Sequence, residues 1–315
     1  MTTASRPWLP LAAIGISVVL WSTAYVTSSF ALGGSSPAVL SVLRFAIALV
    51  VLVPLAALRR GLWTAIRDPR TILLGLTGVT FYYSFANIGL LFTTPGTAAL
   101  TAALLPALTA LAGVVLLRER VRGRVLVGLI FATVGVALVA VAELRLDLGV
   151  MLNVVGLTSY AIYTALLRKD AGTPNAPDAL ALATATSLWG TVLMLPWLAF
   201  ELIAGTARLP ASGPEWIAIL YLGLIVSAPT MVLFNYGAER LPAAISGVAT
   251  AGIPAVGYLF AVLLGEPATS LKNIGGLIAV AGIIIATVRV GAGRTDPPGE
   301  LVSHPRFVKT TGSST

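Results

Sequence analysis

Apolar stretches long enough to cross a lipid bilayer recur along most of this chain. The hydrocarbon layer of a bilayer is about 30 Å thick, so a helix needs about 20 residues to cross it. No water is available in that layer to pair with backbone N–H and C=O groups, and only helices or closed barrels satisfy these groups internally. The alternating pattern of barrel strands is missing from the sequence. The chain is therefore predicted to be an all-α integral membrane protein.

We predict ten transmembrane helices, five in each half of the chain. Composition supports this class, because 57% of the residues are hydrophobic and only 10% are charged, whereas about a quarter of the residues in a soluble domain are charged. Cysteine is absent, which removes disulfides and thiolate metal ligands from consideration. The predicted spans are residues 9–31, 37–57, 71–92, 95–117, 124–142, 148–167, 179–203, 216–237, 242–264 and 271–289.

Lysine and arginine predict how these helices are oriented. Sixteen of the 20 basic residues lie in one set of alternate loops and at the chain ends, and the opposite set holds only Arg145, Arg208 and Lys272. Loops rich in lysine and arginine face the cytoplasm. Both termini are thus predicted to be cytoplasmic, in a bacterial inner membrane. Since the net charge of +8 follows from this bias, nucleic acid is not an expected partner.

The two halves share residues at one offset of 147 positions. Because each half has five spans, an odd number, the second copy must enter the bilayer from the opposite side, as an inverted repeat. We therefore expect a cytoplasmic N-terminus (1–8), repeat 1 (9–142), repeat 2 (143–290) and a disordered cytoplasmic tail (291–315). The matched pairs are Pro95 and Pro242, Glu119 and Glu266, Gly128 and Gly275, Ala132 and Ala279, and Gly135 and Gly282.

The small residues of this pattern have spacings that let helices approach closely. They predict supporting helices at the periphery, or a contact in a weak homodimer, rather than a place for substrate. The protein is expected to be a monomer or a weak homodimer.

Polar and aromatic side chains interrupt several of the apolar spans. Polar groups that face lipid are costly, so such residues turn toward a pathway or toward another helix. The alternative for each polar residue is a helix-to-helix hydrogen bond, and for an aromatic residue near a span end the interfacial belt. The candidate pathway residues are Trp21, Tyr25, Arg44, Tyr82, Tyr83, Asn87, Thr101, Asn153, Tyr160, Tyr163, Asn235 and Tyr236.

Two asparagines are related by the repeat. Asn87-Ile88-Gly89 and Asn235-Tyr236-Gly237 match at an offset of 148, which makes the third and eighth spans partners across the pseudo-two-fold axis. For this pair the pathway interpretation is favoured over a structural hydrogen bond.

Two prolines fall within predicted spans, Pro106 in the fourth and Pro254 in the ninth. A proline inside a helix removes one backbone hydrogen bond and kinks the helix. These residues are candidate gating hinges, and a fixed kink that aids packing is the alternative.

Arg44 lies seven residues into the second span, and no carboxylate occupies a comparable depth. An unpaired charge there costs about 3 kcal/mol or more. The guanidinium either binds a substrate carboxylate or extends outward as a structural anchor.

Acidic residues and histidine are absent from the middle of every predicted span. All twelve acidic residues lie in loops, in the tail or near span ends, and the one histidine, His304, is in the tail. Proton-coupled carriers usually need a titratable group inside the membrane. Facilitated passage or exchange is therefore favoured over a dedicated proton cycle, with a proton-coupled multidrug or metabolite exporter as the alternative.

Several short motifs follow one another along the two repeats. They are Leu20-Trp21-Ser22-Thr23-Ala24-Tyr25, Pro37 with Arg44-Phe45, Thr94-Pro95-Gly96-Thr97-Ala98-Ala99-Leu100 before Pro106, and Leu117-Arg118-Glu119 with Leu264-Gly265-Glu266. In this order they resemble the EamA-type branch of the drug/metabolite transporter superfamily, over about residues 9 to 290. The resemblance implies ten helices around a central cavity and export of small metabolites, most similar to the bacterial aromatic amino-acid exporters.

The predicted function is export or facilitated passage of amino acids, aromatic ones among them, by alternating access. No cofactor and no metal are expected. An intramembrane enzyme would need a Ser-His, Asp-Asp or metal constellation within the spans, and none is present. A receptor or scaffold that transports nothing is the remaining alternative of another class.

Overall fold

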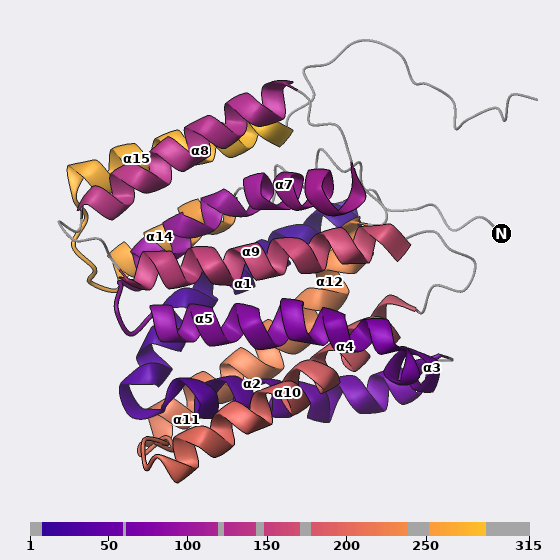
Figure 1. The fold of residues 1–315 in the computed structure, drawn as a ribbon. Coiled ribbons are helices and arrows are strands. Elements are labelled where there is room, and N and C mark those ends of the chain that lie inside the picture. Colours follow the sequence, from indigo (N-terminus) through magenta and orange to yellow (C-terminus); the bar gives the residue numbers. More distant parts are fainter. Residues whose placement is uncertain are drawn as a thin grey trace, which may run out of the picture.

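The computed structural model describes residues 8–58, 61–118, 123–142, 148–170, 178–238 and 252–287. Every regular element in these ranges is helical, and the helices lie side by side in one bundle (Figure 1). The elements up to residue 142 are α1 (Trp8–Gly34), α2 (Pro37–Ala57), α3 (Leu62–Arg67), α4 (Pro69–Gly75), η1 (Leu76–Phe81), α5 (Tyr82–Gly89), α6 (Pro95–Thr101), η2 (Ala102–Leu104), α7 (Leu105–Leu117) and α8 (Gly123–Ala142). Those that follow are α9 (Leu148–Asp170), α10 (Ala179–Ile203), α11 (Gly213–Leu220), η3 (Tyr221–Ser227), α12 (Ala228–Ala238), α14 (Gly252–Leu263) and α15 (Ser270–Thr287).

Seven helical runs in the described residues are long and apolar enough to cross a bilayer. Each corresponds to one of the predicted spans, which confirms an all-helical chain with membrane-length helices. Two shorter apolar helices, Leu126–Val139 and Gly252–Leu263, fall in the predicted fifth and ninth spans. The total of ten spans stays a prediction. Glu119, Pro242 and the tail from 291 lie outside the described residues.

Two of the spans contain a π-helical segment between two α-helices. In the third span the π-helical η1 separates α4 from α5, and in the eighth span the π-helical η3 separates α11 from α12. A π-helical turn adds a residue to the turn and weakens the regular backbone hydrogen-bond ladder, and such turns are frequent at functional sites. The hydrophobic pattern gave no sign of either segment.

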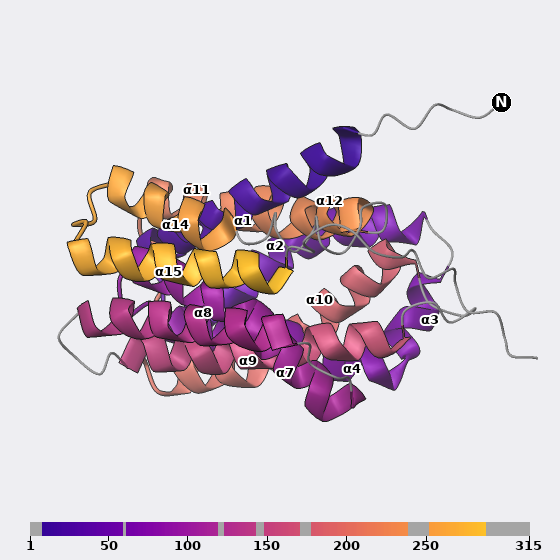
Figure 2. The ribbon, with the colours of Figure 1, turned by 90° about the horizontal axis from the view of Figure 1, so that it is seen from above.

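Helices α8 and α15, which carry the matched small residues, pack directly against each other (Figures 1 and 2). A methyl group placed on Gly135 would lie 2.4 Å from the backbone nitrogen of Ala279 and 2.5 Å from the oxygen of Gly275. A methyl group on Gly282 would meet Ala132 and Gly128 at 2.5 and 2.6 Å.

This contact has two consequences for the relation between the halves. Gly128 lies beside Gly282 and Gly135 lies near Gly275, so the two helices run antiparallel. Gly135 meets Ala279 and Gly275, and Gly282 meets Ala132 and Gly128, so the matched small residues of one copy contact those of the other. The sequence expectation of close-packed supporting helices is met within one chain, by the two repeats contacting each other.

The other helices interlock across the two halves of the chain. Helix α1 packs against α12 and α14, while α9 packs against α5 and α7. Likewise α2 contacts η3 and α10 contacts η1. The first predicted span of each half therefore packs on the third and fourth spans of the other half, and the two halves cannot form separate domains.

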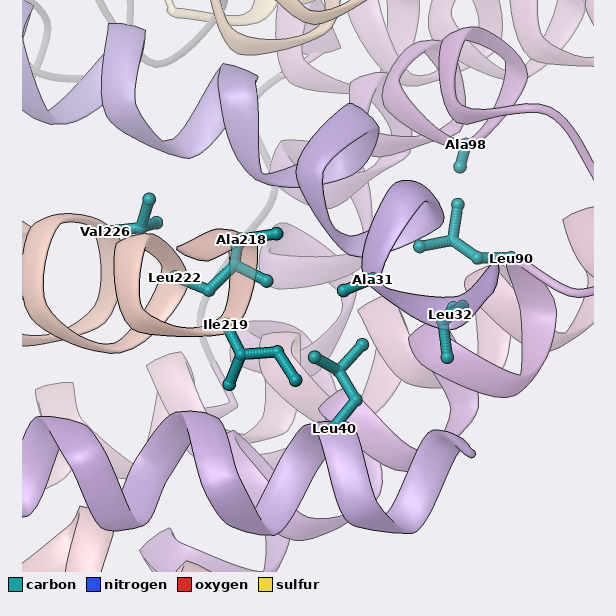
Figure 3. Packing of buried hydrophobic residues seen from close by; sticks show 9 residues of the cluster. All are labelled: Ala31, Leu32, Leu40, Leu90, Ala98, Ala218, Ile219, Leu222 and Val226. Atoms are coloured by element: carbon teal, nitrogen blue, oxygen red, sulfur yellow. The ribbon is translucent and has the colours of Figure 1, made fainter. Parts of the chain in front are cut away.

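An apolar cluster joins the two halves at one end of the bundle (Figure 3). Its members come from the ends of α1 and α11, the starts of α2 and α6, the residue after α5, and η3. We call it the end cluster. It consists of Ala31, Leu32, Leu40, Leu90, Ala98, Ala218, Ile219, Leu222 and Val226.

Candidate functional site

Tyrosines from the third and sixth predicted spans meet between α5 and α9. The rings of Tyr82 and Tyr83 have centroids 4.7 Å apart in an edge-to-face arrangement. Tyr82 contacts Tyr160 at 5.0 Å, and Tyr160 contacts Tyr163 at 5.2 Å. Edge-to-face and tilted ring pairs at these separations are favourable. Four of the predicted pathway residues thus form one continuous aromatic group.

Helix α1 contributes a fifth member to this group, because the Tyr25 side chain interacts with Tyr82. Tyr25, Tyr82, Tyr83 and Tyr160 each keep part of their surface accessible, whereas Tyr163 is buried. We call these five residues the tyrosine cluster. Its members come from both halves of the chain, as a site between repeats requires.

Arg44 on α2 adjoins the tyrosine cluster and is 3% exposed. Its guanidinium carbon lies 4.7 Å from the centroid of the Tyr83 ring, a cation–π contact. Its Nε donates a 2.7 Å hydrogen bond to Oγ of Ser227, the last residue of η3. Among the described residues this is its one hydrogen bond, and no carboxylate forms an ion pair with it.

An arginine side chain has five N–H donors. Since Arg44 uses one of them on Ser227, its remaining donors have no protein partner among the described residues. A buried cation in that state favours a bound anion, and a planar guanidinium suits a carboxylate in particular.

The π-helical segments position both sides of this site. A methyl group on Gly78, the third residue of η1, would lie 2.5 Å from Cδ2 of Tyr163, so the ring packs directly on the backbone there. Ser159 on α9 donates a 2.8 Å hydrogen bond to the carbonyl of Thr77. Gly223, the third residue of η3, abuts Ile47 and the Arg44 carbonyl in the same manner.

Three other predicted residues are engaged in hydrogen bonds that join or brace helices. Asn87 donates a 2.8 Å hydrogen bond to Oγ of Ser41 and is 2% exposed. Asn153 donates to the Gly149 carbonyl at 2.9 Å, and the Thr101 hydroxyl donates to the Thr97 carbonyl at 2.8 Å. The Asn87 bond joins two helices, which is the structural alternative for a polar residue, whereas the Asn153 and Thr101 bonds stay within one helix.

Trp21 contacts a ring outside the tyrosine cluster, that of Phe234 on α12, at a centroid distance of 5.0 Å, and like Tyr25 it packs against the end cluster. Asn235 and Tyr236 belong to α12, but their side chains lie outside the described residues. The structure therefore does not place these two side chains relative to the site.

The two candidate hinges differ in their surroundings. Pro106 is the second residue of α7, two positions after the end of the 3₁₀ segment η2, so the fourth span changes helical geometry next to this proline. Short 3₁₀ stretches inside helices often mark a hinge. Pro254 is buried in the first turn of α14, and residues 239–251 before it are outside the described part.

Several residues of the site escaped the sequence analysis. Phe45 contacts the Tyr83 ring at 4.7 Å and was given no role. Away from the site, Glu201 and Glu266 lie near the ends of predicted spans and were given no role in the pathway, yet both side chains are almost wholly buried. A signal existed for Phe45, because it follows the arginine of a conspicuous Arg-Phe pair in an apolar span.

Comparison with known proteins places these features in a family. The model of the EamA-like transporter family matches residues 8–141 and 147–288. An uncharacterized transporter of Archaeoglobus fulgidus is 26% identical over 284 residues, which are 89% of this chain and 98% of that protein. A protein of Streptantibioticus cattleyicolor named "probable terminal-alkyne amino-acid exporter" is 30% identical over 88% of this chain and 93% of its own length.

A solved crystal structure has a similar fold. It superposes with a TM-score of 0.66 over 88% of this chain and 96% of that chain, at 21% sequence identity. At that identity the likeness shows the fold alone.

Proposed function

Because the chain belongs to the EamA-like transporter family, we propose that it exports amino acids, aromatic ones among them, and related small metabolites across a bacterial inner membrane. The carrier works by alternating access and has both termini in the cytoplasm. The bias of lysine and arginine toward one set of loops supports this orientation.

One observation carries the substrate proposal. Arg44 is a buried cation that contacts Tyr83 and donates one hydrogen bond, to Ser227. Among the described residues its other N–H groups have no hydrogen-bond acceptor, and no carboxylate forms an ion pair with it. A charge at such a site is costly without a partner. The substrate carboxylate supplies the missing anion while it is bound.

The tyrosine cluster supplies the second half of the recognition. Its exposed ring surface beside Arg44 suits an aromatic or apolar side chain, and tyrosine faces also attract an ammonium group. An amino acid has all three groups that this site suits: a carboxylate, an ammonium group and a side chain. The name of the Streptantibioticus relative, an amino-acid exporter, agrees with this class.

The proposed architecture is two inverted five-helix repeats, residues 9–142 and 143–290, around a central cavity. The antiparallel contact of α8 with α15 supports the inversion, as does the occurrence of a π-helical segment in the third and the eighth span. Reciprocal packing of α1 and α9 on the opposite halves supports it further.

The proposed transport cycle uses no proton carrier inside the membrane. Of the described acidic residues that are buried, Glu201 lies in the last turn of α10 and Glu266 follows α14. Both are held at one end of the bundle rather than beside Arg44. A pH gradient should therefore leave the extent of accumulation unchanged.

The test is uptake of labelled substrates into proteoliposomes of the purified protein, with and without pH and sodium gradients. Phenylalanine, its methyl ester and phenethylamine form a matched series that differs at the carboxylate. We expect flux of phenylalanine only, and loss of that flux in Arg44→Gln. Equal flux of phenethylamine would rule out carboxylate recognition by Arg44, and uphill uptake driven by pH alone would favour the proton-coupled alternative.

A further inference from the structure

Two buried carboxylates hold the same end of the bundle in the same way. Oε2 of Glu201, on α10, accepts a 2.5 Å hydrogen bond from the Ser36 hydroxyl, and Oε1 accepts from the Ala38 amide at 3.2 Å. Ser36 is the N-cap of α2, so Glu201 binds the cap hydroxyl and the second amide of that helix.

Glu266 repeats this arrangement on α6. Its carboxylate accepts a 2.6 Å hydrogen bond from the Thr94 hydroxyl and a 2.8 Å bond from the Gly96 amide. Thr94 is the N-cap of α6, and Pro95 follows it as Pro37 follows Ser36. Lys272 adds an ion pair to Glu266 at 3.0 Å. A carboxylate at a helix N-terminus is stabilised by the exposed amides and by the helix dipole.

Both interactions cross between the halves of the chain. The carboxylates belong to the second half and the helix starts belong to the first half. One turn beyond each cap, the same helix places a residue in the end cluster, Leu40 on α2 and Ala98 on α6. The backbone amides of these two residues bond to the carbonyls of Ser36 and Thr94. The position of each carboxylate thus fixes where α2 and α6 insert into the apolar cluster (Figure 3).

We propose that the end cluster is a closed gate and that Glu201 and Glu266 are its two latches. When this end opens, α2 and α6 move away from the second half, which breaks both sets of carboxylate bonds and separates Leu40 and Ala98 from Ile219 and Leu222. This proposal rests on the proposed function, because a gate has meaning only for a carrier that alternates access.

The absence of cysteine from the chain makes single-cysteine labelling direct. Tyr25→Cys reports access to the interior, since it lies six residues before Ala31 on α1, about 9 Å deeper. Gly33→Cys, at an exposed glycine with open space around its Cβ, reports which membrane face carries this end. A membrane-impermeant maleimide is applied separately to right-side-out and inside-out vesicles.

From the face that labels Gly33→Cys, we expect Tyr25→Cys to react about tenfold faster once Glu201→Gln and Glu266→Gln are combined, because hydrogen bonds to a charged group shift an equilibrium by about that factor or more. Since Glu266→Gln also removes the negative charge that pairs with Lys272, a second pair, Ser36→Ala with Gly96→Ala, weakens both latches with the carboxylates retained. A methyl group on Gly96 would lie 2.7 Å from the Glu266 carboxylate.

The matched control is Glu215→Gln. Glu215 also caps backbone amides near this end, but it accepts them from Ala211 and Ser212 of its own segment. With Glu215→Gln added, Tyr25→Cys should be labelled at the same rate as in the chain that carries Tyr25→Cys alone. The gate proposal is wrong if the labelling rate of Tyr25→Cys is unchanged in both double variants that weaken the latches. It is also wrong if Glu215→Gln raises that rate as much as they do. Absence of amino-acid flux in the native chain, with Tyr25 intact, would instead overturn the substrate proposal and leave the labelling result standing.

Discussion

The helix pair α8 and α15 and the pair formed by the third and eighth spans are both related by the repeat, but they differ in kind. In the first pair the helices are regular, and all six matched small residues take part in the close backbone contact. In the second pair each span is interrupted by a π-helical segment, and the matching residues differ in spacing and chemistry. The two copies therefore keep the same residues and spacing in the helices that pack together, and differ in both in the spans that line the candidate site.

The physical reason lies in what each contact tolerates. Two backbones that touch through glycine leave no room for a single added methyl group, so the spacing must be kept in both copies. A binding site between inverted halves faces an asymmetric substrate, and its two sides need different side chains. Arg44 comes from one half and its hydrogen-bond partner Ser227 comes from the other.

The largest effect on stability should come from the α8 and α15 contact. Gly135→Ala and Gly282→Ala each place a methyl group within 2.6 Å of backbone atoms that cannot rotate away. We expect each to lower the free energy of unfolding by about 3 kcal/mol, the upper range for overpacking. Thermal unfolding of the purified protein in detergent measures this.

Gly123→Ala is the matched control, because its Cβ would meet nothing within 4 Å. Alanine is the better helix former, so this variant should be neutral or slightly more stable. If Gly135→Ala is as stable as Gly123→Ala, the close contact does not hold the pair together.

The next largest effect should fall on flux rather than stability. Arg44→Lys keeps the positive charge but loses the Nε donor to Ser227 and the planar group that stacks on Tyr83. We expect amino-acid flux to fall about tenfold, equivalent to about 1.4 kcal/mol, with unfolding changed far less than in Gly135→Ala. Flux equal to the parent would mean that only the charge at this position matters.

The sequence predicted the helical class well because the constraint is strong. Backbone groups in lipid have to pair internally, and apolar length alone then marks spans such as Pro37–Ala57 and Ala179–Ile203. The pairing of α8 with α15 was only partly predictable. The small residues predicted a close helix contact, but the constant spacing of 147 residues between matched positions does not predict that the two copies contact each other.

The candidate site was predicted in part. Tyr82, Tyr83, Tyr160 and Arg44 stood out because aromatic and charged groups interrupt apolar spans. The π-helical segments could not be predicted, since a single added residue leaves the apolar pattern nearly unchanged. Glu201 and Glu266 were set aside because they lie near span ends, and only their contacts with Ser36 and Thr94 show why they are buried.

A smaller effect on flux should come from the π-helical segment η1. In Gly78→Ala the added methyl group would lie 2.5 Å from the Tyr163 ring, which has to move. Because a side chain can shift where a backbone cannot, we expect a loss of stability of only about 1 kcal/mol and a fall in flux. The control is Gly15→Ala on α1, where the space is open. Equal flux in both variants would contradict a role for Tyr163 packing in transport.

The smallest effect should come from Asn87→Ala. This variant decides whether Asn87 lines the transport pathway or only makes a hydrogen bond between helices. Its amide donates to Ser41 and is buried, so a double-mutant cycle of Asn87→Ala with Ser41→Ala should give a coupling of about 0.6 kcal/mol, the average for hydrogen bonds between membrane helices. Flux per folded molecule should equal that of the parent, because the amide faces α2 and already has a partner. A several-fold fall in flux at unchanged stability would instead show that Asn87 belongs to the transport pathway. The third span would then contribute a functional residue in addition to Tyr82 and Tyr83.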